Sequence, residues 1–301
     1  MKHTPGPDGR DLSVLAIGCV GFTPDAQDRT DEMLDAWVEN GGNIIDTAWV
    51  YGGGEATTSV GNWLQKRGVA EQVCIYTKIC HPWGEPRFGP EFFLEDLAAE
   101  RERLQVECID VVGFHRDGPE VPISEMMSAV VSAYEAGHFK ALAASNWTIE
   151  RVAAWNAYAE VHGGVPFAFN NPNLSLATVN EPMWGGCLTA GDEERSWHAS
   201  TGLPLWSWSA TGGGFFAEVD NDDVRRVYHN EENFRRLERA RELGSKRGLK
   251  PVQVALLWTL HQPFPTRAIV GPQTVEQIAE LATVASESLS VEEVRWLETG
   301  E

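Results

Sequence analysis

Short apolar segments alternate with helical segments along most of the chain, and this rhythm limits the possible fold more than any other feature. The apolar segments read as buried strands, and most are followed by polar stretches rich in Ala, Glu and Leu with helical periodicity. Strands are expected at Ser13–Cys19, Asn43–Ala48, Val73–Ile79, Ile109–His115, Phe139–Ser145, Pro166–Asn170, Leu203–Ser209 and Arg267–Val270. Expected helices include Asp28–Asn40, Pro90–Leu104, Pro122–Ala136, Ile149–His162 and Glu231–Arg247. About eight such units predict an α/β fold, a closed (β/α)8 TIM barrel that forms one domain over residues 1–301.

Two intervals are too long for simple connections between a strand and a helix. Between Ser209 and Arg267 we expect a long functional loop, which contains the Gly-rich stretch Gly212–Gly214, and two helices. The segment from Asn171 to Trp197 is a second long excursion. Both are expected at the C-terminal face of the barrel, where the active sites of such folds lie.

A Rossmann fold is the alternative architecture, and it would place a Gly-rich pyrophosphate turn after the first strand. The segment Gly18–Phe22 lacks the third glycine at the required spacing, and the chain contains no G-x-x-x-x-G-K-[S/T] motif. Gly52–Gly54 is able to cradle a phosphate but adjoins the residues described below. The barrel is therefore preferred.

Composition excludes several classes of function. The chain has 24 Lys and Arg against 44 Asp and Glu, a formal charge of −20, which repels nucleic acids and anionic membranes. No apolar run approaches the ~18 residues of a membrane span, and the N-terminus has no hydrophobic signal segment. Cys74 and Cys80 lie on one face of an expected strand, about 20 Å apart, too far to form a disulfide or share a metal. We expect a reduced, cytoplasmic protein without a metal; the sequence leaves its oligomeric state open.

Polar residues interrupt three of the apolar strands near their C-terminal ends. Asp46 lies near the end of one strand, with Tyr51 just beyond it, and His115 ends another. Lys78 stands in a run that otherwise reads as buried, in a chain with few lysines. Because the C-terminal ends of the strands form the active face of a barrel, these four side chains are expected to meet.

Together, these four side chains suggest a site for proton transfer. A buried lysine needs a compensating carboxylate, and Asp46 is the natural partner of Lys78. The lysine ammonium is expected to lower the pKa of the Tyr51 phenol and make it a proton donor or acceptor near neutral pH. His115 is then placed to orient a carbonyl group or to help to pass the proton.

On these residues the chain resembles the aldo-keto reductase superfamily. The segment from Gly42 to Gly52 resembles the first signature of that family, in which the residues that correspond to Asp46 and Tyr51 are catalytic. Lys78 and His115 match the other two catalytic positions in order and spacing. The resemblance extends from about Ser13 to the C-terminus and implies an NADP(H)- or NAD(H)-dependent carbonyl reductase that transfers hydride between the nicotinamide and an aldehyde or ketone.

The resemblance also implies a set of cofactor-binding positions. Ser145 and Asn146 resemble the strand end that holds the nicotinamide carboxamide, with Asn171 at a position where Gln is usual. Trp208 takes the place of an aromatic residue that stacks on the nicotinamide, and the segment from Ser209 to Gly214 resembles the loop over the pyrophosphate. The implied set comprises Gly21, Ser145, Asn146, Asn171, Trp208, Ser209, Ala210, Gly214, Gly271, Gln273, Gln277 and Glu280.

The largest departure from the family pattern lies at the adenine end. Gln273 stands where the family has the Arg or Lys that pairs with the 2′-phosphate of NADP(H), and Gly271–Leu281 contains no Lys or Arg. A dianionic phosphate is best bound by an arginine fork, whereas a ribose hydroxyl is satisfied by neutral or acidic acceptors. The departure weakens the preference for NADP(H), unless Arg267 or the Lys246/Arg247 pair compensates.

Aromatic and charged residues near the strand ends indicate the type of substrate. Trp49, Trp83, Trp147 and Trp184 lie in or beside strand-end loops, and Arg116 directly follows His115. Flat plates beside charged groups suit a small sugar-like or polyol-like carbonyl compound, so Trp49, Trp83, Arg116 and Trp147 are the predicted substrate pocket.

Two other functions use parts of the same pattern. One is a non-catalytic barrel that binds nicotinamide nucleotides as a sensor or auxiliary subunit, but such a protein has no use for a buried Lys–Asp pair beside Tyr51. The other is a two-carboxylate glycosidase built on Asp46, Glu55 or Asp117, which leaves Lys78 and His115 without roles.

Overall fold

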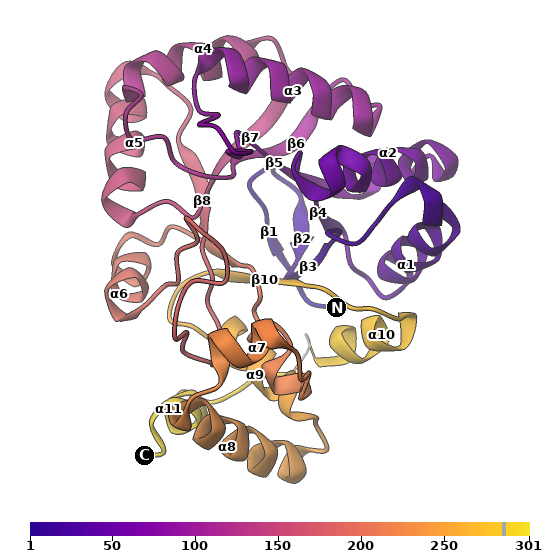
Figure 1. The fold of residues 1–301 in the computed structure, drawn as a ribbon, viewed down its shortest axis with the longest axis vertical. Helices are drawn as coiled ribbons and strands as arrows, with labels where there is room; N and C mark the ends of the chain where they lie inside the picture. The colour runs from indigo at the N-terminus through magenta and orange to yellow at the C-terminus, as the bar shows by residue number, and fades with distance from the viewer. Residues whose placement is uncertain (285–286) are drawn as a thin grey trace.

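Eight parallel strands close into a barrel in the computed structural model, which describes residues 1–284 and 287–301 (Figure 1). Around the barrel the strands follow the order β10-β3-β4-β5-β6-β7-β8-β9. Their bounds are β3 Leu15–Gly18, β4 Ile44–Asp46, β5 Cys74–Ile79, β6 Ile109–Phe114, β7 Phe139–Ser145, β8 Phe167–Asn171, β9 Leu205–Ser207 and β10 Thr266–Val270. The predicted (β/α)8 barrel is therefore confirmed, and each predicted strand corresponds to an observed one.

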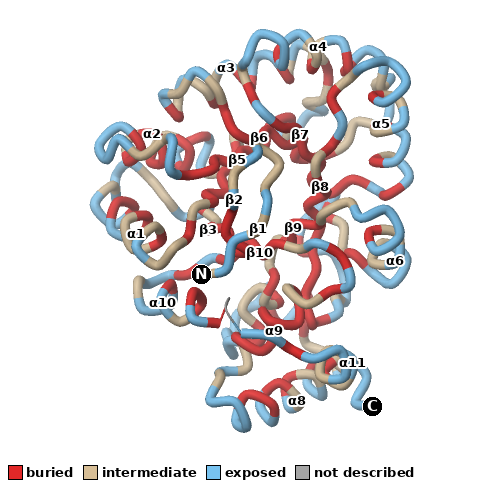
Figure 2. The backbone as a smooth tube through the Cα atoms, turned by 180° about the vertical axis from the view of Figure 1, so that it is seen from behind, coloured by how far each residue is buried: buried red, intermediate tan, exposed pale blue. Residues whose placement is uncertain are grey.

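Helices surround the barrel, and their outer faces are exposed while their inner faces are buried (Figure 2). The α-helices are α1 Gln27–Glu39, α2 Glu55–Arg67, α3 Pro90–Leu104, α4 Ile123–Glu135, α5 Ile149–His162, α6 Asp192–Thr201, α7 Asp222–Tyr228, α8 Glu231–Arg247, α9 Pro251–Leu260, α10 Val275–Val284 and α11 Val291–Thr299. Four short 3-10 turns are η1 Pro24–Ala26, η2 Tyr51–Gly54, η3 Ala70–Gln72 and η4 Phe215–Ala217. Local sequence sets several of these ends: the Thr148 hydroxyl caps α5, and Gly163 ends it at φ +67°, a conformation that favours glycine.

The inside of the barrel is filled by aromatic and small apolar side chains. Phe169 and Trp206 stack with their ring centroids 4.0 Å apart, and the ring of Tyr76 packs edge-on against both. Leu12, Ala16 and Ile269 belong to the same interior cluster. The barrel is thus a packed core, and any ligand site must lie at one of its ends.

A short hairpin, missed by the sequence analysis, lies across the N-terminal end of the barrel (Figure 1). Its strands are β1 His3–Pro5 and β2 Asp11–Ser13, so the expected strand Ser13–Cys19 is in fact the last residue of β2 followed by β3. Leu12 inserts into the interior cluster, while the Arg267 guanidinium at the start of β10 donates to the carbonyls of Thr4 and Pro5. This end of the barrel is therefore closed.

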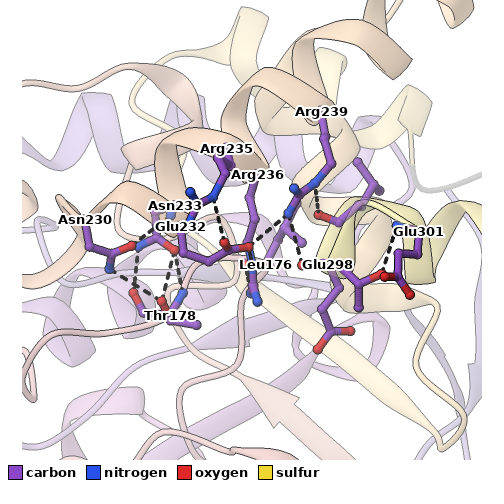
Figure 3. Close-up of polar contacts among 12 residues, drawn as sticks. Leu176, Thr178, Asn230, Glu232, Asn233, Arg235, Arg236, Arg239, Glu298 and Glu301 are labelled. Atoms are coloured by element: carbon purple, nitrogen blue, oxygen red, sulfur yellow. Dashed lines mark hydrogen bonds and ion pairs between the residues drawn. The ribbon is translucent and has the colours of Figure 1, made fainter.

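The interval between Ser209 and Arg267 contains three α-helices, α7, α8 and α9, rather than the expected two, because the acidic stretch after η4 forms the short helix α7. Side chains of α8 hold the excursion that follows β8 (Figure 3). The Asn233 amide donates to the Thr178 carbonyl (2.7 Å) and accepts from its N–H (2.9 Å), and Arg236 donates to the Leu176 carbonyl (2.7 Å). These bonds fix the excursion over the C-terminal end of the barrel.

Candidate active site

Four side chains predicted to be catalytic converge at the C-terminal end of the barrel. Asp46 is the last residue of β4, Lys78 lies one residue before the end of β5, and His115 directly follows β6. Tyr51 begins the η2 turn. The Lys78 Nζ atom lies 5.1 Å from the centroid of the Tyr51 ring, and the rings of Tyr51 and His115 meet edge to face at 5.9 Å. The structure therefore brings together the residues that the sequence spacing selected.

Lys78 and Asp46 form a buried ion pair. Lys78 Nζ donates to Asp46 Oδ1 and, over 2.9 Å, to the Thr47 carbonyl, and both side chains are almost fully buried. Burial raises the pKa of Asp46 and lowers the pKa of Lys78, while the opposite charge of the partner opposes each shift. The pair places an ammonium group beneath the Tyr51 ring.

The expected effect of this ammonium on Tyr51 is wrong in direction. Burial and the neighbouring Asp46 carboxylate raise the pKa of the Tyr51 phenol well above its usual value of 10.0. The charge of Lys78 is largely compensated by Asp46, so it does not make up for the loss of solvation. In the free protein the phenol is therefore protonated at neutral pH, the form in which it donates a proton.

His115 is neutral near pH 7. Burial, together with the positive charges of Lys78 and Arg116, lowers its pKa well below the usual 6.5. Its Nδ1 atom is buried and has no hydrogen-bond partner among residues 1–284 and 287–301. Because this nitrogen is buried, it is not open to a ligand; the neutral ring as a whole lies edge to face with Tyr51.

His81 is a further neighbour that the sequence analysis missed. It lies two residues after β5, and its ring centroid is 4.7 Å from that of His115. Burial and the charge of Arg116 lower the pKa of His81. The rule that found His115, a polar residue just beyond a strand end, would also have found His81.

The predicted substrate-pocket residues lie in different environments. Trp49 is half-buried, contacts the exposed Trp83 edge to face, and stacks under the Arg87 guanidinium at 4.8 Å. Trp147 exposes 1% of its surface and stacks on Phe114, so it is a core residue and not the predicted pocket residue. Its burial follows from packing against Phe114 of β6, Phe167 of β8 and Trp155 of α5, which the position after a strand does not reveal.

Arg116, the fourth of these residues, lines a cavity of about 530 Å³ between the loops that follow β5 and β6. Its Nη1 atom donates to the His115 carbonyl (2.7 Å) and its Nη2 atom to Cys187 Sγ (3.2 Å). The side chain thus ties His115 to the excursion after β8. Cys187 was not singled out by the sequence because nothing local marks it.

The positions predicted to hold the nicotinamide carboxamide are largely engaged with one another. The Asn146 amide donates to Ser145 Oγ (3.1 Å), and its oxygen accepts from Trp208 Nε1 (3.1 Å). The Asn171 amide points into the barrel, where it accepts from the Tyr76 hydroxyl (3.2 Å) and donates to the Trp206 carbonyl. Hydrogen bonds therefore join the side chains of Ser145, Asn146 and Trp208 into one cluster. The Asn171 side chain is instead bonded inside the barrel.

The segment predicted to pass over the pyrophosphate has an unusual backbone. Ser209 and Gly212–Gly214 all have positive φ angles, between +49° and +100°, so successive residues of this turn favour glycine. Ala210 is buried, and its carbonyl accepts from the Thr259 hydroxyl. A Cβ added at Gly21 or Gly271 would meet open space, so the backbone is accessible at both positions.

These features fit the dinucleotide that the resemblance implies. The accessible glycine backbone suits phosphates, and the half-exposed Trp208 offers a flat face. Asn171 does not fit this role, because its amide is used inside the barrel.

At the predicted adenine end, Gln273 and Gln277 are bonded to each other and Glu280 is paired with Lys250. The cations expected to compensate for Gln273 lie elsewhere. Arg267 is bound at the closed end of the barrel, Lys246 pairs with Glu242, and Arg247 pairs with Glu293.

Arg29, on α1, instead donates to the Gln273 carbonyl over 3.1 Å. The sequence analysis missed Arg29, because 244 residues separate it from Gln273. It is an exposed side chain, so its guanidinium is able to reach a nucleotide phosphate.

Residues 1–284 and 287–301 contain neither a cluster of metal-ligating side chains nor a membrane-crossing helix. No group of three or more His, Cys, Asp or Glu side chains is placed to hold a metal ion. In the same part of the chain, no helix has the length and apolar character that crossing a membrane requires.

Comparisons with known proteins show the relatives of the chain. A family model described as the aldo/keto reductase family matches residues 15–299. The oxidoreductase YrpG of Bacillus subtilis (strain 168) is 26% identical over 318 residues, which cover 99% of this chain and 95% of that protein. Norsolorinic acid reductase A of Aspergillus parasiticus is 26% identical over 287 residues, 89% of this chain and 70% of that protein. An aldo-keto reductase of Klebsiella pneumoniae, solved in complex with NADPH, has a TM-score of 0.76 at 21% identity and covers 99% of this chain and 94% of that one.

Proposed function

The chain belongs to the aldo/keto reductase family, an NAD(P)-dependent oxidoreductase family, and on that premise we propose that Tyr51 is the proton donor when the enzyme reduces an aldehyde or ketone. The convergence of Tyr51, Lys78, Asp46 and His115 carries this proposal. Of the four, only the phenol combines a proton at neutral pH with a position between the other groups.

The side chains have separate tasks in the reaction. A reduced nicotinamide, when bound, would supply the hydride that the carbonyl carbon takes up. Tyr51 Oη donates its proton to the carbonyl oxygen, which becomes the alcohol, and the resulting phenolate is stabilised by the Lys78 ammonium before it takes a proton from water. His115, whose neutral ring lies edge to face with that of Tyr51, orients the polar end of the substrate.

Replacement of Tyr51 tests this assignment. Tyr51→Phe keeps the ring and removes the acidic hydrogen, so we expect kcat for carbonyl reduction to fall about 10²- to 10⁴-fold. Nucleotide binding, measured by quenching of tryptophan fluorescence, should change little. Near-wild-type turnover in Tyr51→Phe, with hydride transfer shown to be rate-limiting, would contradict the assignment. Binding of nucleotide without reduction of any carbonyl by the wild-type protein would favour a non-catalytic sensor instead.

We also propose that the enzyme uses NADH as well as NADPH. Gln273 offers the 2′-phosphate only neutral groups. Arg29, the cation that bonds to the Gln273 carbonyl, approaches it from another helix and is exposed. An exposed, single guanidinium binds a phosphate more weakly than a buried fork does.

The substrate is proposed to be a small, polar carbonyl compound, such as a sugar-like or polyol-like one. Arg87 over Trp49 and Arg116 beside His115 support this proposal, since they put charged donors and a flat ring next to the reacting groups. Activity towards a panel of carbonyl compounds that includes keto-sugars and unsubstituted aldehydes tests it, with the higher kcat/KM expected for the hydroxylated members.

A further inference from the structure

Arg116 is a buried cation with too few partners. It exposes 9% of its surface, yet it forms no ion pair within the described part of the chain. Its two hydrogen bonds go to the neighbouring His115 carbonyl and to a sulfur atom, which is a weak acceptor. A guanidinium has five N–H donors, and a buried charge without an anionic partner is costly.

Arg267 shows how this chain satisfies a buried guanidinium when its role is structural. It exposes 4% of its surface and also lacks a carboxylate partner in the residues described, but it makes four hydrogen bonds to oxygen atoms. Those acceptors are the carbonyls of Ser13, Thr4 and Pro5 and the Thr4 hydroxyl. Arg116 has one oxygen acceptor, whereas Arg267 has four. The protein therefore leaves N–H donors of the Arg116 guanidinium without an oxygen acceptor.

The other arginine and the aspartate that line the cavity are already paired. Arg87 pairs with Asp96 (2.6 Å) and Glu95, and Asp117 pairs with Arg151 (3.2 Å). Glu85 and Glu120 also line the cavity, but both are exposed and therefore hydrated. Within the described residues, Arg116 is the one cation that lines this cavity and has no carboxylate partner.

The position of Arg116 links this charge to the reaction. Its guanidinium bonds to the backbone of His115, whose ring faces Tyr51 at 5.9 Å, and on the far side it contacts Cys187. An anionic group of a bound molecule that reaches Arg116 from this cavity would thus lie one residue along the chain from His115, the residue whose ring contacts Tyr51.

We infer that Arg116 binds a carboxylate, or a similar anionic group, that belongs to the carbonyl substrate. The inference rests on the proposed function and deepens it: the preferred substrates are small carbonyl compounds with an acidic group a few bonds away from the carbonyl carbon. The carboxylate replaces the missing acceptors of the guanidinium through charge-assisted hydrogen bonds.

A matched pair of substrates tests the inference. 4-Formylbenzoate and 4-formylbenzamide have nearly the same shape and reactive aldehyde, but only the first is charged. We expect the wild-type enzyme to have a kcat/KM about ten- to a hundredfold higher for the carboxylate. In Arg116→Gln this ratio should fall to about one, and in Arg116→Lys it should be intermediate, because lysine keeps the charge and loses the fork.

Arg225→Gln is the control variant. Arg225 is paired with Asp220 on exposed α7, so its removal changes the net charge equally and should leave the ratio unchanged. A wild-type ratio near one, or a ratio that Arg116→Gln does not lower, would overturn the inference while the reductase assignment stands. An equal fall in Arg225→Gln would also overturn it, since net charge alone would then explain the preference.

Binding gives a second readout that does not depend on turnover. Benzoate should quench tryptophan fluorescence of the wild-type protein at lower concentrations than benzamide, and Arg116→Lys should reduce that difference if Arg116→Gln does not fold. If no carbonyl compound is reduced, the proposed function fails, and the benzoate titration still decides whether Arg116 binds an anion. Equal binding of benzoate and benzamide by the wild-type protein would refute the inference.

Discussion

The buried charged groups at the two ends of the barrel differ in how many hydrogen-bond and ion-pair partners they have. At the N-terminal end, Asp110 accepts from Arg10 (2.7 Å), from Lys140 (2.7 Å) and from the Ile75 N–H (2.9 Å), and Arg267 donates to four oxygen atoms. At the C-terminal end, the Lys78–Asp46 pair lies beside His115 and Arg116, whose polar atoms have few partners. The protein supplies close partners for the charges of Asp110 and Arg267 at the N-terminal end, and fewer partners for the guanidinium of Arg116 at the C-terminal end.

This difference in partners distinguishes charged groups that stabilise the fold from charged groups that serve a ligand site. A buried polar group without a partner costs free energy, so its retention needs an explanation other than folding. At the C-terminal end the proposed explanation is a ligand, because His115 lies against the Tyr51 ring and Arg116 lines the adjoining cavity. At the N-terminal end the same residue types close the barrel with the β1–β2 hairpin.

The largest effect is expected for the one buried pair at the C-terminal end. Lys78→Met leaves the Asp46 carboxylate buried without its cation, which typically costs about 3–5 kcal/mol of stability. The variant should also lose carbonyl reduction, since nothing then stabilises the Tyr51 phenolate. Urea denaturation and a turnover assay measure the two effects.

A double-mutant cycle tests whether the loss of stability comes from the contact between Lys78 and Asp46. Asp46→Asn combined with Lys78→Met should cost much less than the sum of the single substitutions, because the partners contact each other. Simple additivity would show that the pair does not exist in solution.

The nucleotide preference is the next largest effect. Gln273→Arg supplies a fork for the 2′-phosphate and should tighten NADPH binding by about 1.5–3 kcal/mol, or ten- to a hundredfold, with little change for NADH. Fluorescence titration with both nucleotides checks this. Arg29→Gln should weaken NADPH binding only modestly; if the native protein prefers NADPH more than about a hundredfold and Arg29→Gln abolishes the preference, Arg29 has replaced the missing cation.

The dependence of stability on pH gives the smallest effect. The pKa of His115 is held well below 6.5 in the folded protein, whereas in the unfolded chain it takes up its proton near 6.5. The unfolded state therefore binds more protons as the pH falls below about 6.5, and the free energy of unfolding falls by up to about 1.4 kcal/mol per pH unit for this histidine.

Urea denaturation between pH 7 and 5.5 measures this slope. His115→Gln should make it shallower, while His162→Gln, on the exposed end of α5, should not. An unchanged slope in His115→Gln would mean that the imidazole is not held neutral. His81, whose pKa burial also lowers, supplies part of the remaining slope.

The strands and the residues at their C-terminal ends could be predicted from the sequence, because both depend on position along a strand. The eight strands have clear apolar runs, and Asp46, Lys78 and His115 were found because a parallel barrel brings all strand ends to one face. The β1–β2 hairpin escaped because its strands have three residues each, too few for a periodic pattern.

Properties that depend on three-dimensional surroundings could not be predicted from sequence. The raised pKa of Tyr51 reflects burial and Asp46, and the sequence offered only Lys78 as a guide. Trp147 is core because Phe114 covers it, and Arg29 reaches Gln273 from the far end of the chain. In each case the property depends on a neighbour that is distant in sequence, or on the degree of burial.

The stability of two arginine variants tests the contrast between the ends most directly. Arg267→Met leaves four oxygen acceptors without their donor and should lower the free energy of unfolding, measured by urea denaturation, by about 2 kcal/mol or more. Arg116→Met removes a buried charge that the protein itself scarcely satisfies, so the free energy of unfolding should change by less than about 1 kcal/mol or rise. A loss in Arg116→Met as large as that in Arg267→Met would show that Arg116 serves the fold, and would contradict the claim that the C-terminal end keeps its charges for a ligand.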